Sequence, residues 1–345
     1  MKKISVCTRY DTLGASSRLR FFMYRKKLIE NGVFSVYYPL LSNGYLKRLY
    51  SGRDTRLHAA FAILKRLLIL PFLKKELLVE YELLPFVPFG VERFFLGKRK
   101  YILSFDDAVW EKYNHHPALE GKFEKLASGA LGIIVANDVL KKHLEPYNSN
   151  IIKIPTAVDL DKYQTAENDR DSRFTVVWIG TPVTYTECLM PFAGMLKKAA
   201  EKVDFELIVI AAKDLPPIQG VNMSFYDWSN ETEAAMIKRA HVGIMPLPEN
   251  DFMRGKSAYK LIQYLGAGLP CIASPVGENR VLLSQGNVGF SAANDEEWID
   301  AFCRLSGDRE LYEQLKANSL VLAKEYSIQK YSPIMADFIK RCFET

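Results

Sequence analysis

The chain has 345 residues, of which 48% are hydrophobic and 25% are charged. This composition is that of an ordinary globular protein, and the length favours two domains over a single core. The five cysteines are scattered without a CxxC pair, which argues against a zinc site and indicates reduced thiols in a cytosolic protein. The start of the chain, MKKISVCTRYD, lacks the apolar segment of a signal peptide, and no run of 18 apolar residues predicts a membrane span.

The charge is unevenly distributed along the chain. Residues 1–100 hold 20 Lys and Arg against 7 Asp and Glu, a net charge of +13, and the remainder holds 26 against 33. A half this basic either seeks an anionic partner, such as a lipid surface, a phosphorylated acceptor or nucleic acid, or is a solvated basic face. Because it lacks interleaved surface aromatics of the stacking type, a nucleic-acid partner is not expected.

The first strand and helix flank a loop that contains glycine. KISVCTRY predicts the strand, DTLGASS the loop around Gly14, and RLRFFMYRKKLIEN a helix ended by Gly32. Arg18 and Arg20 fall in the first helical turn, where the helix dipole disfavours cations. They either bind an anion there or extend into water. The loop does not have the GxGxxG spacing, so a dinucleotide site is poorly supported.

VFSVYYPLL predicts a second strand, and residues 45–75 predict basic helices. Leu57, Phe61, Leu64 and Leu68 form an apolar stripe at helical spacing. Such a helix can lie on an anionic bilayer surface, but more often it packs against its own sheet, and we expect the second arrangement.

Carboxylates end the next two predicted strands. ELLVEYELLP places Glu80 and Glu82 on one face at the exit of the third strand. A pair of carboxylates there can do acid–base work, but we expect two surface glutamates. KYILSFDDAVW ends the fourth strand at Asp106 and Asp107. Either aspartate can cap the following turn, and we favour a functional role over capping. Two carboxylates are too few for an oxygen-ligand cage, so no metal is predicted.

The first domain is predicted over residues 1–156 and the second over 170–328, with the polar TAENDRDSR as the linker. The second domain opens with the strand FTVVWIG. In the loop that follows, Gly180 and Thr181 offer backbone and hydroxyl donors for a diphosphate.

The segment HVGIMPLPENDFMRGKSAYKLIQYLGAGLPCIASPVGEN predicts strand, loop, helix, strand and glycine loop. Ser257 is the expected N-cap of the helix and Gly268 the residue after its end. Arg254, Gly255, Lys256 and the helix start form a basic, donor-rich edge that suits a diphosphate. Lys260 and Gln263 share a face of this helix, and Gly277 permits a close backbone approach ahead of Glu278 and Asn279. Two ordinary strand–helix units with a solvated basic loop are the alternative.

The segment GKSAYKLIQYLGAGLPCIASPVGEN resembles the donor site of retaining glycosyltransferases of family 4, the group 1 glycosyl transferases. The resemblance implies an α/β protein of the GT-B fold, with two Rossmann-like domains whose parallel sheets face each other across a cleft. A terminal helix at 331–343 would pack back on the N-terminal, acceptor-binding domain. The resemblance also implies a metal-independent hexosyltransferase without a cofactor, whose co-substrate is a nucleoside-diphosphate sugar.

The same resemblance suggests roles for individual residues. Asp106 would occupy the place of a histidine near the reacting sugar, and Arg254 and Lys256 would meet the leaving-group charge. The donor would be bound by a larger set: Gly14, Gly180, Thr181, Gly255, Ser257, Lys260, Gln263, Gly277, Glu278 and Asn279. Arg18, Arg20 and Asp107 would bind the acceptor or an anion.

The chain departs from the family pattern in two places. The family usually has two glutamates eight residues apart around the donor helix, where this chain has Gly255 and Gln263. Gln263 can still bond ribose hydroxyls as donor and acceptor. The loop at Gly180 also lacks the family's Arg and Lys.

The function predicted from these features is transfer of a sugar, with retention, to a glycan or lipid-linked acceptor. The expected context is cell-surface polysaccharide synthesis in the cytoplasm, with peripheral association at the inner face of the membrane as an option. A GT-B sugar-nucleotide epimerase and a non-catalytic scaffold derived from a transferase are the alternatives.

Overall fold

A computed structural model describes residues 2–113, 116–165 and 173–344. The chain divides into two compact units. Unit 1 is Met1–Thr156, Gly255–Ser257 and Ile328–Thr345, and unit 2 is Ala157–Arg254 and Ala258–Ser327. Residues 166–172 of the predicted linker lie outside the described ranges.

Unit 1 is built on a parallel sheet that has six strands in the described residues, in the order β2-β1-β3-β4-β5-β6. Its strands are β1 (Lys2–Tyr10), β2 (Val33–Leu41), β3 (Glu76–Glu80), β4 (Lys100–Phe105), β5 (Gly132–Val135) and β6 (Ile151–Lys153). Its helices are α1 (Ala15–Ser17), η1 (Arg18–Phe22), α2 (Arg25–Glu30), α3 (Asn43–Tyr50), α4 (Arg56–Ile69), η2 (Leu70–Phe72), α5 (Phe89–Leu96), η3 (Val109–Lys112), η4 (Pro117–Leu119), α6 (Lys122–Ser128), α7 (Asp138–Leu144) and α17 (Ile328–Glu344).

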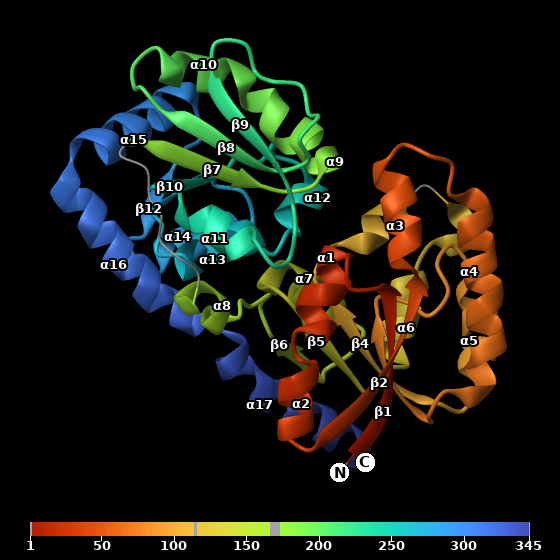
Figure 1. Cartoon of the computed structure of the whole chain (residues 1–345). Coiled ribbons are helices and arrows are strands. Elements are labelled where there is room, and N and C mark those ends of the chain that lie inside the picture. Colours follow the sequence, from red (N-terminus) through yellow and green to blue (C-terminus); the bar gives the residue numbers. More distant parts are fainter. Residues whose placement is uncertain (1, 114–115, 166–172, 345) are drawn as a thin grey trace. The chain divides into compact units, whose positions relative to one another are not determined.

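The apolar strands of unit 1 are covered on both faces, as a parallel sheet requires. Helices α4 and α5 lie along one side of this sheet, and α2 and α17 lie along the other (Figure 1). Lys2 Nζ donates a hydrogen bond to the main-chain oxygen of Phe343 at 3.0 Å, which ties the terminal helix to the first strand.

Unit 2 repeats this plan, with a parallel sheet in the order β12-β11-β10-β7-β8-β9. Its strands are β7 (Thr175–Ile179), β8 (Glu206–Ala211), β9 (Asn222–Asp227), β10 (Val242–Met245), β11 (Cys271–Ala273) and β12 (Gly289–Ser291). Its helices are α8 (Leu160–Thr165), α9 (Pro182–Thr184), η5 (Tyr185–Leu189), η6 (Met190–Phe192), α10 (Ala193–Ala200), α11 (Glu233–Lys238), α12 (Asp251–Arg254), α13 (Tyr259–Gly266), α14 (Glu278–Ser284), α15 (Asp295–Gly307) and α16 (Arg309–Glu325). The predicted α/β class, with two Rossmann-like parallel sheets, is confirmed.

The predicted helix over SAYKLIQYLGA begins later than expected. α13 starts at Tyr259, and its N-cap is Ala258 in the left-handed conformation (φ 51°), so the prediction that Ser257 is the N-cap is wrong. The predicted end is confirmed, since Gly268 has φ +70° and the amide of Leu269 donates to the carbonyl of Tyr264.

The apolar stripe of α4 does not pack against the sheet, contrary to expectation. Leu57, Phe61, Leu64 and Leu68 are all exposed. The opposite face of the helix packs inward and carries the buried Arg66, whose guanidinium donates to the main-chain oxygens of Thr8 and Tyr38 at 3.0 and 2.8 Å. No helix in the described residues combines the length and apolarity needed to cross a bilayer.

Glu82 belongs to a buried cluster of charges rather than to the surface. Lys122 Nζ lies 2.6 Å from Glu82 and 2.7 Å from Glu92, and Arg9 also pairs with Glu82. The expectation that Glu80 and Glu82 are surface glutamates is wrong, because tertiary packing supplies cations and hydroxyl groups that compensate both carboxylates.

Candidate functional site

Three neighbouring strands of unit 2 bring the predicted donor residues of this unit to one edge. β11, β10 and β7 are adjacent and parallel, so their carboxyl ends share an edge. Gly180 and Thr181 follow β7, the loop with Arg254 follows β10, and Gly277 to Asn279 follow β11. Ligands bind at this edge in open α/β sheets.

The loop after β7 is tightly organised. Thr181 caps α9 in a reciprocal arrangement, in which its amide donates to Thr184 Oγ1 at 2.9 Å and its hydroxyl accepts from the Thr184 amide at 3.2 Å. Its main-chain amide donor is thus engaged by the fold, and its hydroxyl oxygen serves as an acceptor. A Cβ at Gly180 would lie 2.3 Å from the indole of Trp178, and Lys260 Nζ lies 5.4 Å from the centre of a ring of the same indole. This shared neighbour brings Lys260 close to the Gly180 loop.

The loop after β10 carries the predicted cations. The half-exposed Arg254 donates to Asp251 at 2.5 Å and to Glu249 at 3.3 Å. Both carboxylates are largely exposed, so these pairs are weak and exchangeable. Lys256 and Ser257 are partly buried, and they group with Gly255 in unit 1. Within unit 1, the Gly255 carbonyl accepts a hydrogen bond of 3.1 Å from Asn137 Nδ2.

Gly277 permits a close backbone approach within unit 2. Its φ is +53°, and a Cβ there would lie 2.3 Å from the main-chain oxygen of Arg254. Asn279 is buried. Its main-chain N–H donates to the Val276 carbonyl at 3.2 Å, and its side-chain Nδ2 donates to the Ser274 carbonyl at 3.2 Å. Asn279 therefore stabilises the loop after β11 through these hydrogen bonds, and the neighbouring Glu278 is also buried.

Gln263 lies in a buried polar network instead of on an open surface. Its Nε2 is 3.4 Å from Glu233 Oε2, which also accepts from the indole N–H of Trp228 at 2.8 Å. The other Glu233 oxygen accepts from Lys162 at 2.9 Å. One donor of the Gln263 side chain is therefore directed at Glu233, and its role toward a ribose stays a prediction. Sequence reasoning missed Glu233, which lies 30 residues earlier on another helix.

A second cluster of polar side chains lies at the carboxyl edge of the unit 1 sheet. Ser16 Oγ lies 2.8 Å from both Glu80 Oε1 and Asp106 Oδ1, and Tyr81 donates its hydroxyl proton to Asp106. Ser17 Oγ donates to the second oxygen of Glu80 at 2.5 Å. Register pairs Glu80 with Ser104, two residues before Asp106, which explains why the two carboxylates meet. Asp106 is buried, and Tyr81 has a strained backbone with φ 60°.

This arrangement can hold an extra proton. Ser16 has one hydroxyl hydrogen and can donate it to one carboxylate at a time. Burial raises the pKa of Glu80 to about 7, with the Asp106 charge adding to the effect and the hydrogen bonds from Ser17, the Arg9 amide and Ser16 opposing it. Glu80 is thus suited to exchange a proton near neutral pH.

We predict that Glu80 makes the stability of the protein depend on pH. The pKa is about 7 in the fold against an ordinary 4.5, so the folded state retains a proton that the unfolded chain has lost between these values. The free energy of unfolding should fall as pH rises through this window, by up to about 3 kcal/mol relative to Glu80→Gln. Urea titrations of both proteins from pH 4.5 to 8 measure this. Parallel pH profiles of the two proteins would refute the assignment.

The other predicted residues of unit 1 have differing surroundings. Arg20 is buried, and its guanidinium donates to the main-chain oxygen of Ile154 at 2.5 Å; anion binding by Arg20 stays a prediction. Arg18 is also buried, and Asp107 is partly buried beside Asp106. A Cβ at Gly14 would lie 2.2 Å from Tyr10 Cβ, so this glycine is required by packing.

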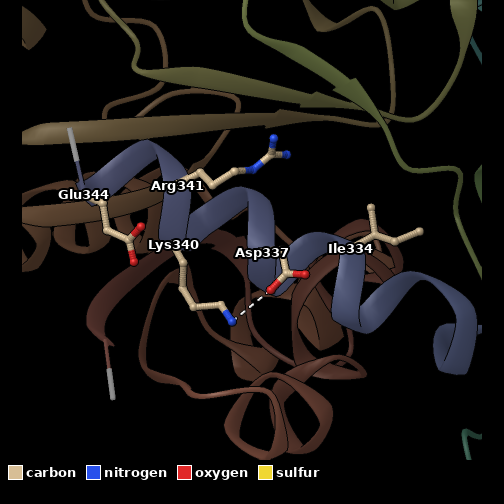
Figure 2. A pocket seen from close by; sticks show the side chains of 5 residues that line it. All are labelled: Ile334, Asp337, Lys340, Arg341 and Glu344. Carbon is tan, nitrogen blue, oxygen red and sulfur yellow. Dashed lines mark ion pairs between the residues drawn. The ribbon is translucent and has the colours of Figure 1, made fainter.

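A hollow of about 470 Å³ is lined entirely by α17 and lies apart in sequence from every predicted site residue. Figure 2 shows its lining side chains, with the Lys340–Asp337 ion pair of 2.8 Å among them. Because one helix provides every lining residue, we do not assign it a ligand. Among the described residues, no group of three or more His, Cys, Asp and Glu is placed to hold a metal ion.

Comparisons with known proteins give a family match over part of the chain and similar folds over nearly all of it. Residues 173–308 match the family model described as "Glycosyl transferases group 1". A glycosyltransferase from Rickettsia africae ESF-5 is similar in structure, with a TM-score of 0.68 at 12% identity over 100% of this chain and 99% of that one. Sucrose-phosphate synthase from Thermosynechococcus elongatus has a TM-score of 0.68 at 12% sequence identity, and the match covers 100% of both chains. Anabaena Alr3699/HepE in complex with UDP has a TM-score of 0.66 at 11% sequence identity, and the match covers 99% of this chain and 100% of that one. No curated protein matches the chain in sequence.

In the described residues each unit has a six-stranded parallel sheet, and the fold is similar to that of solved glycosyltransferases, the GT-B fold. The family match then narrows the class, since most of unit 2 carries the sequence pattern of group 1 glycosyl transferases. Together they support a group 1 glycosyltransferase, as the donor-site resemblance predicted.

Proposed function

We propose that this chain is a glycosyltransferase that moves a sugar from a nucleoside-diphosphate sugar to a glycan or lipid-linked acceptor. The observation that carries the proposal is the group 1 match over residues 173–308, which contains the β7, β10 and β11 loops that share one sheet edge. The resemblance to family 4 adds retention of configuration, the absence of a required metal, and a role in cytoplasmic synthesis of cell-surface polysaccharide.

In unit 2 we assign the donor diphosphate to the edge formed by the Gly180 and Gly277 loops. Lys260 lies beside the first loop. In the described residues, the acidic partners of Arg254 are exposed, and a phosphate can replace them. Lys256 is assigned the leaving-group charge together with Arg254, since phosphate departure needs electrostatic stabilisation. In unit 1 we assign Asp106 to the acceptor hydroxyl or the developing sugar cation, with Glu80 as its proton partner.

The direct test offers the purified protein a panel of UDP-, GDP-, ADP- and dTDP-sugars and measures release of the nucleoside diphosphate. UDP-sugars come first, because the Anabaena structure contains UDP. Product analysis with donor alone tests the epimerase alternative, which gives an isomerised sugar nucleotide and no free diphosphate. Calorimetric titration without binding of any nucleotide would favour the non-catalytic scaffold.

We predict that Arg254→Ala and Lys256→Ala each lower turnover by about 100-fold or more, because each removes a cation assigned to the departing diphosphate. Both residues lie outside the fully buried core, so circular dichroism should report an intact fold. The matched control is Lys213→Ala, an exposed lysine of unit 2 that pairs with Asp227 at 3.6 Å. Near-normal turnover in both site variants would refute the assignment of the diphosphate to this loop.

A further inference from the structure

Helix α4 presents large apolar side chains to solvent along its whole length. Its exposed residues, with Phe72 of η2, form what we name the α4 apolar face. The exposed fractions are 83% for Leu57, 68% for Phe61, 53% for Leu64, 67% for Leu68 and 78% for Phe72. In Figure 1, α4 runs along the outside of unit 1.

The contacts of the opposite side of α4 hold this face toward solvent. At about 100° per residue, the four leucine and phenylalanine positions of α4 fall within a sector of roughly 60°, and Arg66 falls opposite. Arg66 is buried and donates to the carbonyls of Thr8 and Tyr38, which belong to two strands of the sheet. Turning the helix to bury its leucines would break both bonds and bring apolar groups to carbonyls that need donors. The apolar face is therefore built into the native packing.

Leaving this surface in water is costly. Full burial of a Leu or Phe side chain stabilises a protein by about 1.5–3 kcal/mol, and monomers rarely expose contiguous apolar patches. A face of this length indicates an apolar occupant.

The surrounding charge identifies that occupant. Arg56 and Lys65 flank the apolar sector on its two sides, about 110° and about 70° from its centre. Between residues 47 and 100, the only exposed acidic side chain is Asp54. The exposed cations of this segment are Lys47, Arg53, Arg56, Lys65, Lys74, Lys75, Arg93, Lys98 and Lys100. A second copy of the chain would bring these cations against each other, whereas anionic lipid headgroups neutralise them.

We propose that the α4 apolar face docks unit 1 onto an anionic lipid bilayer. Leucine and phenylalanine side chains enter the boundary between headgroups and acyl chains, and the flanking lysines and arginines contact lipid phosphates. The surface is independent of the nucleotide-binding edge of unit 2, so the inference stands apart from the proposed catalytic activity.

Co-sedimentation with vesicles tests the proposal on the full-length chain. We expect binding to vesicles of phosphatidylcholine with 30% phosphatidylglycerol, weak binding to phosphatidylcholine alone, and loss of binding as salt rises to 0.5 M. The double variant Leu57→Ser/Phe61→Ser should weaken binding by about tenfold or more, since two inserted side chains are removed. The matched control Val321→Ser replaces an exposed apolar residue of α16 in unit 2 and should bind as the natural protein does.

Three outcomes would overturn the proposal: no binding to anionic vesicles, equal binding by the double variant, or equal binding to neutral vesicles. Analytical ultracentrifugation tests the alternative that a second copy of the chain covers the α4 apolar face. A dimer that disappears in the double variant, without vesicle binding by the natural chain, assigns this face to self-association instead. Both serine substitutions fall on exposed positions, so circular dichroism of the variants should match that of the parent.

Discussion

Asp106→Asn is expected to lower the rate of sugar transfer by about 100-fold or more while the fold persists. The amide oxygen can still accept from Tyr81 and Ser16, so the hydrogen bonds that position the side chain survive. The substitution removes the negative charge and the ability to take a proton, which are the properties assigned to Asp106. Initial rates with a saturating donor, compared with thermal unfolding, separate activity from stability.

Asp138→Asn is the control for this substitution. Asp138 starts α7 in unit 1 and pairs with Lys153 at 2.7 Å, but it is mostly exposed and belongs to no predicted site. Turnover of the control should match that of the natural protein. If Asp106→Asn retains more than about half the natural rate, Asp106 only caps the turn after β4, and the unit 1 assignment fails.

Lys122→Met is expected to destabilise unit 1 by about 3–5 kcal/mol. Lys122 is buried between Glu82 and Glu92, and its ammonium group also donates to the Leu84 carbonyl at 2.7 Å. Methionine has a side chain of similar length but no charge, so Glu82 and Glu92 lose the ammonium group that pairs with them in the interior. Burial already raises the pKa of Glu92 although Lys122 lowers it, so loss of the lysine raises it further. The destabilisation should therefore be larger at pH 8 than at pH 5.

The exposed pair Lys153–Asp138 supplies a matched control in the same unit. Lys153→Met removes a lysine–carboxylate contact of similar length, 2.7 Å, from a solvated position and should cost under about 1 kcal/mol. Urea unfolding followed by circular dichroism measures both variants. Equal losses for Lys122→Met and Lys153→Met would mean that burial does not strengthen the dependence of the cluster on its cation.

Local sequence pattern predicted the order of strands and helices well. Apolar runs such as VFSVYYPLL coincide with β2 (Val33–Leu41), because strand formation in a buried parallel sheet depends on the apolar character of a short segment. Gly268 was predicted at the end of α13 because a left-handed backbone suits glycine. The start of the same helix was placed too early, since the left-handed Ala258 has no sequence signal of that kind.

The polar contacts of the candidate site were much harder to predict. Thr181 and Asn279 were expected to offer donors to a ligand, and both are engaged by neighbouring main-chain or side-chain groups. Gln263 pairs with Glu233 across two helices, which no spacing rule indicates. Glu80 was expected at the surface, but strand pairing and the loop after β1 bring it next to Ser16 and Asp106.

The sequence by itself determined the succession of β and α segments and the glycine and aspartate positions at strand ends, because these depend on residues close together in the chain. It also carried the group 1 pattern over residues 173–308. Only the tertiary structure decided which face of α4 meets water and which carboxylates meet at the same serine hydroxyl. Those outcomes depend on partners such as Arg66 with Thr8, or Glu80 with Asp106, which are separated by 58 and 26 positions and meet only when the sheet assembles.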